Sequence, residues 1–265
     1  MITFSSAQLD ALLAAYFYPL ARILAFAATA PIFNNAALPR RIRLVFGLAL
    51  TLAIAPTVTV PQDIPPGSGI GLLILGHQIL IGIALGFVMR LVFSGIELAG
   101  ELISSQMGLG FATLYDPSSA AQTGVISEFT NLCASLVFLA LNGHLLMIAT
   151  LAESFRVLPL APNTVTAGLW LNLAEAGSRI FSLGLFLSLP VIMALLITNM
   201  SLAILSRAAP QLNMMAMGFP ITMLVGFVVL ALSLSYWVTP LSRMFMEGIQ
   251  QMLAVFPPPS IRGSP

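Results

Sequence analysis

The sequence contains 265 residues, of which 58% are apolar and only 7% are charged. Because a water-soluble domain carries roughly 25% charged residues, this composition excludes an ordinary soluble protein. The net charge of +1 provides no broad basic surface, so nucleic acid is not expected as a partner. The chain is predicted to be an integral membrane protein.

Apolar runs follow one another along the chain, and each is predicted to be helical. They cover about 11–33, 44–60, 70–93, 129–151, 180–205 and 214–238. A helix needs roughly 20 residues to cross a bilayer, so every run except 44–60 is long enough, and 44–60 is a marginal span. The predicted fold class is an all-α membrane protein with about six apolar helical segments. Residues 1–256 are expected to form a single membrane-embedded domain.

Prolines fall inside several of the apolar runs and are expected to break them. Pro19 interrupts the first run together with Arg22, and Pro190 and Pro220 interrupt later runs. In lipid, irregular backbone survives only where protein or a wet cavity covers it. We therefore expect packed, partly polar helix interfaces. Gly82 and Gly86, a GxxxG pair in the third run, would permit close contact with another helix.

Three arginines follow the first apolar run and predict a cytoplasmic basic loop. They are Arg40, Arg41 and Arg43. Positive charge near a span favours the cytoplasmic side. With an extracytoplasmic N-terminus, Arg90 and Arg207 fall on the same side as these three. The bias is slight, because the opposite side holds four arginines, namely Arg156, Arg179, Arg243 and Arg262. Either successive segments do not simply cross the membrane in alternating directions, or several segments do not cross it at all.

A polar stripe follows the third apolar run. At 100° per residue its members fall within about 40° of one line on a helix. They are Arg90, Ser94, Glu97, Glu101, Ser104 and Gly108. A carboxylate at the bilayer centre costs on the order of 3 kcal/mol, so the stripe should face water or a polar partner. Two interpretations stay open: a solvated helix face outside the membrane, or a stripe that faces a pore or another subunit.

The segment after this stripe combines flexible and apolar residues. Its distinctive members are Gly108, Gly110, Phe111, Tyr115, Asp116 and Pro117. Asp116 and Pro117 are typical of the cap and first turn of a new helix. Composition alone is compatible with an ordinary connection between helices. The sharper hypothesis is a mobile gate whose aromatic tip swings on the glycines.

Near the C-terminus, in residues 241–256, apolar side chains recur at helical spacing and polar side chains occupy the positions between them. This pattern predicts an amphipathic helix suited to a membrane interface or a partner. The proline-rich tail, 257–265, is expected to be disordered. The lone Cys133 lies inside an apolar run and is interpreted as a small buried residue.

Catalytic and ligand-binding motifs are absent from the sequence. His77 and His144 are the only histidines, and neither belongs to an HExxH motif. Neither a phosphate-binding GxxxxGK[ST] loop nor a GxSxG elbow occurs. We predict no catalytic residue, metal site or cofactor, and no enzymatic activity. A secondary transporter, which also uses broken helices, and a structural membrane scaffold remain alternatives.

Several stretches spread along the chain together resemble one family. They are 38–43, 107–117 with Gln122-Thr123 and Glu128-Phe129, 141–146, and 207–213 with 218–220. They resemble the basic loop, the GxxFATxxDP region and later motifs of the FliR family. Its members are export-gate proteins of the bacterial flagellar type III secretion system. The resemblance covers essentially residues 1–256 and leaves the tail outside.

The resemblance carries implications for fold, partners and mechanism. It implies kinked helical hairpins raised partly out of the bilayer, in a gate with FliP-like and FliQ-like subunits and an adjacent FlhB-like subunit. That gate would lie in the flagellar basal body of the bacterial inner membrane and pass unfolded flagellar subunits outward. It also implies that the loop Gly108–Ser119 plugs the closed channel, with Phe111 and Tyr115 as plug side chains. The equivalent subunit of a virulence injectisome is the alternative within this class.

Overall fold

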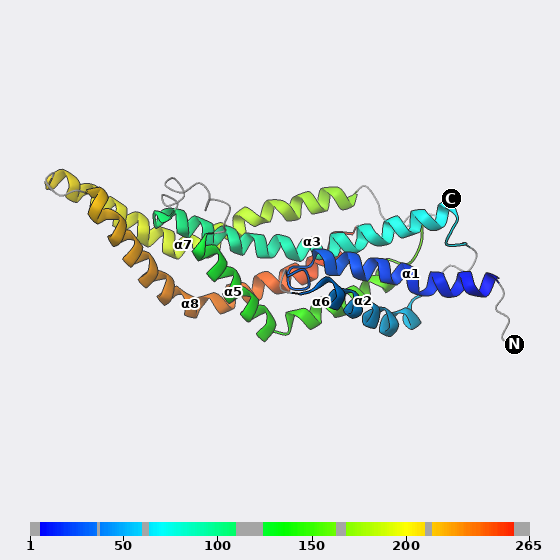
Figure 1. The fold of residues 1–265 in the computed structure, drawn as a ribbon. Helices are drawn as coiled ribbons and strands as arrows, with labels where there is room; N and C mark the ends of the chain where they lie inside the picture. Colours follow the sequence, from blue (N-terminus) through cyan, green and yellow to red (C-terminus); the bar gives the residue numbers. More distant parts are fainter. Residues whose placement is uncertain are drawn as a thin grey trace. The chain divides into compact units, whose positions relative to one another are not determined.

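The computed structural model describes residues 6–35, 38–59, 64–109, 124–162, 168–209 and 214–256. Over these ranges the chain forms helices and no strand (Figure 1). The α-helices are α1 (Ser6–Thr29), α2 (Arg40–Ile54), α3 (Gly69–Gln106), α5 (Val125–Ala140), α6 (Gly143–Val157), α7 (Gly168–Ala208) and α8 (Met214–Ala254), and the 3-10 turn η1 (Ala55–Thr57) follows α2. The predicted all-α class is confirmed.

Three of the described helices, α3, α7 and α8, are long and apolar enough to cross a membrane. The broken pair α5 and α6 would provide a fourth crossing if the two helices act as one span. Helix α2 has 15 residues. At 1.5 Å per residue it is about 22 Å long, which is shorter than the roughly 30 Å hydrocarbon core. The run 44–60 is therefore too short to span alone.

The helix breaks do not occur at the prolines, so that expectation is wrong. Pro19 lies inside α1, Pro190 inside α7 and Pro220 inside α8. A membrane helix tolerates proline because neighbouring groups and local adjustments satisfy the freed carbonyl. The break occurs instead at Asn142, within the run 129–151 that was expected to be one span. Asn142 has a left-handed backbone with φ 55°, and its carbonyl accepts the first hydrogen bonds of α6.

The chain divides into two compact units. The first consists of Met1–Leu91, Asn142–Gly177 and Met246–Pro265, and the second of Val92–Leu141 and Ser178–Phe245. Helices α3, α7 and α8 each contribute to both units. That residues 1–256 behave as a single domain stays a prediction.

In the first unit, α1 packs between α2 and the first half of α3 (Figure 1). A Cβ on Gly82 would overlap the carbonyl of Arg22, and one on Gly86 would overlap the Thr29 hydroxyl. The prediction of close helix contact at this GxxxG pair is therefore confirmed. On the other side of α1, a Cβ on Gly47 of α2 would lie 2.5 Å from Leu24 Cδ2.

In the second unit, an aromatic cluster joins three helices. Phe93 of α3, Phe138 of α5 and Phe245 of α8 have ring centroids 5.0–5.7 Å apart. Burying aromatic rings of this size contributes roughly 2–3 kcal/mol each. Helix α3 also meets α7 closely, because a Cβ on Gly184 would lie 2.9 Å from the carbonyl oxygen of Gly95.

The amphipathic segment 241–256 continues α8 and does not form a separate helix. Its apolar residues Met244, Phe245 and Met252 are buried, whereas its charged residues are exposed. The amphipathic pattern is confirmed, but the apolar face packs within the chain instead of remaining free for a membrane or a partner. Cys133, which was expected to be buried, is a free thiol of intermediate exposure.

Candidate functional site

The outward face of α3 in the second unit is polar. Glu101 and Ser105 are exposed, and Ser94 and Glu97 are half-buried. Ser94, Glu97 and Glu101 are members of the predicted stripe, and they belong to one continuous helix. Ser104, which was predicted to share this face, is buried, because it lies against Gly124 at the start of α5, and the exposed neighbour is Ser105. Arg90, the first member of the stripe, is exposed and belongs to the first unit. The helix therefore places both carboxylates on a face that its own unit does not cover.

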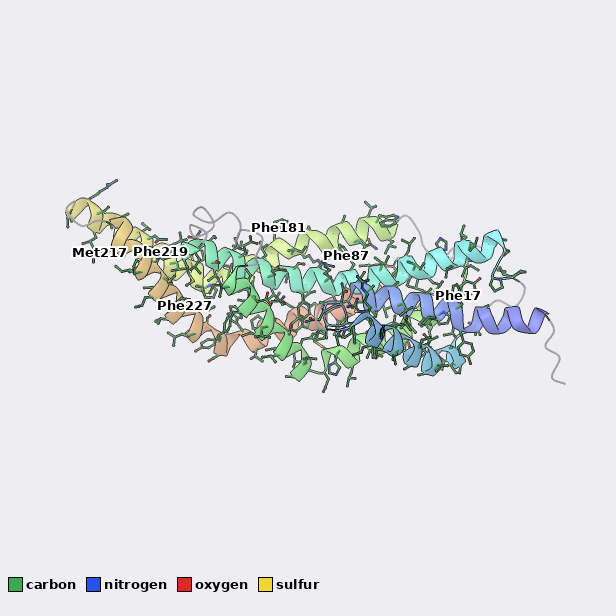
Figure 2. The ribbon with its side chains drawn as sticks, viewed as in Figure 1. Phe17, Phe87, Phe181, Met217, Phe219 and Phe227 are labelled. Atoms are coloured by element: carbon green, nitrogen blue, oxygen red, sulfur yellow. The ribbon has the colours of Figure 1, made fainter. Side chains whose placement is uncertain are left out.

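Elsewhere the second unit presents apolar side chains to its surroundings. Figure 2 labels Phe181 on α7 and Phe219 and Phe227 on α8, and all three are exposed. Exposed aliphatic side chains accompany them on the same helices, namely Leu185, Met193, Ile197, Ile204, Leu224 and Leu232. Such faces suit lipid or an apolar partner. The exposed face of α3 thus differs in polarity from the exposed faces of α7 and α8.

A polar seam continues from α3 onto the start of α5. The Oγ atoms of Ser104 and Ser127 lie 3.4 and 3.6 Å from the position that a Cβ on Gly124 would take. Ser127 is 3% exposed, and its Oγ finds no hydrogen-bond partner among the described residues. Asn131 Oδ1, one turn further along α5, also lacks a partner in the described part of the chain.

The carboxylates of Glu97 and Glu101 have no compensating cation in the described ranges. By contrast, Glu153 on α6 forms an ion pair with Arg156 at 3.3 Å. An uncompensated carboxylate is costly in hydrocarbon, so these groups require water or a polar partner. This stripe-and-seam surface is the principal candidate site.

The predicted gate begins where α3 ends. Gly108 has φ 82°, and its N–H donates to the carbonyl of Ser105 at 3.1 Å, which terminates the helix. The preceding Met107 is buried beside Gly226 of α8, and its carbonyl accepts a hydrogen bond from Thr222 Oγ1 at 3.3 Å. The other predicted gate residues, Gly110, Phe111, Tyr115, Asp116 and Pro117, lie outside the described residues. The gate stays a prediction, and the structure describes only its anchored start.

The three N-terminal arginines lie in a helix and not in a loop, which corrects the sequence expectation. Arg40, Arg41 and Arg43 belong to the first turn of α2, directly after Pro39. Proline is disfavoured inside a helix but acceptable at its start, which explains the boundary. Arg40 and Arg41 are exposed and Arg43 is half-buried. Their cytoplasmic location stays a prediction.

Sequence reasoning missed a buried arginine in the first unit. Arg22 on α1 has no exposed surface. Its Nε donates to Gln78 Oε1 at 2.8 Å, and its Nη2 donates to the same oxygen and to the Leu158 carbonyl at 2.8 Å. Its Nη1 donates to Ser154 Oγ at 3.1 Å, and its guanidinium carbon lies 4.1 Å from the ring centroid of Phe155. Neutral acceptors and an aromatic face therefore compensate the charge.

A signal for this cluster was present in the sequence. Arg22 is a cation inside an apolar run, and Gln78 is a polar residue inside another. Membrane-embedded polar groups almost always seek one another. Within the described residues, no group of three or more His, Cys, Asp or Glu side chains could hold a metal ion.

Comparison with known proteins gives matches over nearly the whole chain. Residues 13–248 match the model of the family described as bacterial export proteins, family 1. The chain is 42% identical over 254 residues to the flagellar biosynthetic protein FliR of Pectobacterium carotovorum subsp. carotovorum, covering 96% of this chain and 97% of the relative. The Escherichia coli K12 protein of the same name is 40% identical with the same coverage. That of Aquifex aeolicus is 31% identical over 240 residues, covering 89% of this chain and 90% of the relative.

Proposed function

Because the chain belongs to the bacterial export proteins, family 1, we propose that it is a subunit of the flagellar protein export gate. The observation that carries this function is the identity of 42% with a FliR protein over nearly the full length of both chains. A match of this extent includes the helices of both units and is not confined to one motif. The function assigned is conduction of protein and not catalysis.

The polar face of α3 suits a conducting role. An unfolded polypeptide exposes its backbone and charged side chains, so its path through the membrane must be polar. Glu97 and Glu101 on α3 provide carboxylates without a cation beside the largely apolar outward faces of α7 and α8. Behind them, Ser127 and Asn131 of α5 provide buried polar atoms without a partner among the described residues. We assign this surface to an aqueous lumen or a polar subunit contact, as the sequence pattern predicted.

The proposal includes assembly with other membrane subunits, similar to FliP and FliQ, and with a FlhB-like subunit. The most apolar window of α3 is 61% buried within the chain, whereas those of α7 and α8 are only 28% and 17% buried. Helices α7 and α8 therefore need cover from lipid or from partners. We propose that this assembly lies in the flagellar basal body at the bacterial inner membrane.

The gate hypothesis assigns channel closure to the segment from Gly108 to Pro117. The start of this segment is anchored, because Met107 is buried and its carbonyl accepts a hydrogen bond from Thr222 of α8. The positive φ of Gly108 then turns the chain out of α3. An aromatic tip that contributes roughly 2–3 kcal/mol per buried ring would close the channel and still yield to a substrate. Replacing both Phe111 and Tyr115 by serine should make assembled gates leaky to small solutes. Gates that assemble normally with this change and remain tight would contradict the hypothesis.

Complementation tests the function itself. Expressing the chain in a flagellated bacterium that lacks its FliR should restore swimming and the secretion of hook and filament subunits. Restoration of an injectisome mutant, but not of a flagellar mutant, would support the injectisome alternative. A chain that folds as a stable monomer in mild detergent and restores neither system would favour an independent transporter.

A further inference from the structure

Helix α2 presents an uncovered apolar surface next to a cluster of positive charge. Its inward face, Gly47, Thr51 and Ile54, is buried in the first unit. Its outward side chains are apolar and between 42% and 65% exposed, namely Ile42, Leu44, Val45, Leu48 and Leu52. The helix is too short to cross the membrane, so this surface is not that of a spanning segment.

The positive charge of α2 is concentrated at one end. Arg40, Arg41 and Arg43 occupy its first turn, and the helix contains no acidic residue. In the part of the chain that the structure describes, no carboxylate forms an ion pair with them. Arg43 is partly engaged within the chain, because its Nη2 donates to the Asn35 carbonyl at 3.4 Å and its Nε is buried, whereas Arg40 and Arg41 are exposed. The helix dipole adds further positive charge at this end. The first turn therefore attracts an anion that the described chain does not supply.

We infer that α2 is an interfacial helix that binds anionic phospholipid, with its arginines on the headgroup phosphates and its apolar face against the acyl chains. Guanidinium groups bind phosphate oxygens in a bidentate manner. Charge at one end and apolar residues along the rest suit a helix that enters the interface obliquely.

Two features favour lipid over a protein subunit as the occupant. Helices α3, α7 and α8 are long and apolar enough to cross a membrane, so lipid is available to the outward apolar faces of the chain. The charged end and the apolar side of α2 also match the two regions of a lipid monolayer, which are the anionic headgroup region and the hydrocarbon region. A protein partner would need an acidic patch and an apolar groove in the same arrangement.

The test compares the lipid preference of two double variants of the full chain, each in its assembled complex in nanodiscs. In Arg40→Gln/Arg41→Gln two exposed arginines of α2 are neutralised. In the matched control, Arg179→Gln/Arg243→Gln, two exposed arginines of other helices are neutralised. Phosphatidylglycerol is titrated into phosphatidylcholine nanodiscs, and the phosphatidylglycerol retained after detergent extraction is counted by native mass spectrometry. An arginine near an anionic surface is worth about a fivefold change in affinity.

We expect wild type and the control to retain phosphatidylglycerol in preference to phosphatidylcholine. The α2 variant should lose about 25-fold in apparent affinity for phosphatidylglycerol, which is about fivefold for each arginine. High salt should weaken the wild-type preference, because exposed charges are screened. Unchanged retention by the α2 variant, or an equal loss in the control, would overturn the inference.

Hydrogen exchange of residues 40–54 provides a second measurement. Lipid binding predicts stronger protection in nanodiscs with phosphatidylglycerol than in pure phosphatidylcholine. The same protection in both lipids and in lipid-free detergent complexes would show that another subunit covers α2, and would overturn the assignment to lipid. Because both altered arginines are exposed, we expect the variants to assemble as wild type does.

Discussion

Replacing Arg22 by lysine tests how the first unit is held together. The guanidinium donates two hydrogen bonds to Gln78 Oε1, one to Ser154 Oγ and one to the Leu158 carbonyl. Lysine carries a compact ammonium that lacks the planar fork of arginine. It cannot serve acceptors from α3, α6 and the segment after α6 together. We expect Arg22→Lys to lose at least two of these hydrogen bonds.

The size of the effect follows from these contacts. Hydrogen bonds to a charged group contribute about 1.5–3 kcal/mol each, so losing two costs about 3–6 kcal/mol. In the wild type the guanidinium carbon of Arg22 lies 4.1 Å from the centroid of the Phe155 ring. Weakening this cation–π contact adds about 0.5–2 kcal/mol to the loss of stability. We expect the free energy of unfolding to fall by about 4 kcal/mol. At about 2–4 °C per kcal/mol for a chain of this size, Tm should fall by about 10 °C.

The assay is thermal unfolding of the purified complex in mild detergent, followed by helical circular dichroism. Arg156→Lys is the matched control, because the Arg156 side chain is 79% exposed and forms a surface ion pair with Glu153. Such pairs contribute about 0–1 kcal/mol, so the control should melt close to wild type. If Arg22→Lys melts within about 2 °C of the control, the hydrogen bonds of Arg22 do not hold α1, α3 and α6 together.

Two further predictions concern the second unit, and one of them takes its control, Gly177, from the first unit. The first uses single cysteines in a Cys133→Ser background. Glu101→Cys should react in assembled gates with a water-soluble thiol reagent, whereas Phe181→Cys should react only with a lipid-soluble reagent. The reverse pattern would contradict the assignment of a polar face to α3. Gly100→Ala should destabilise the complex by about 1–3 kcal/mol in thermal unfolding, because its Cβ would lie 2.5 Å from Ser127 Cα. The control is Gly177→Ala, because a Cβ at Gly177 would meet nothing within 4 Å. This change should be neutral or stabilising by up to about 1 kcal/mol. Equal effects of Gly100→Ala and Gly177→Ala would refute the packing argument.

Much of the architecture could be predicted from the sequence, because it depends on local properties of the chain. An apolar content of 58% excludes water as the solvent of most side chains, and long apolar runs in lipid must be helical. That Glu97 and Glu101 share a helix face was predictable for the same reason, since it follows from helical periodicity alone. The burial of Ser104 was not predictable, because it depends on the contact with α5. The contact at Gly82 and Gly86 was predictable as a contact, although not its partner α1.

Tertiary structure decided where the helices bend and how buried charge is compensated. Three prolines that were expected to break helices lie within them, whereas the break occurs at Asn142, whose side chain tolerates a left-handed backbone. Arg22 finds its acceptors 56, 132 and 136 residues away, in Gln78, Ser154 and Leu158. Helical periodicity describes a single segment, so it contains no information about which distant segments meet. Those pairings depend on the shapes and polar groups of helices that pack together only in the folded chain.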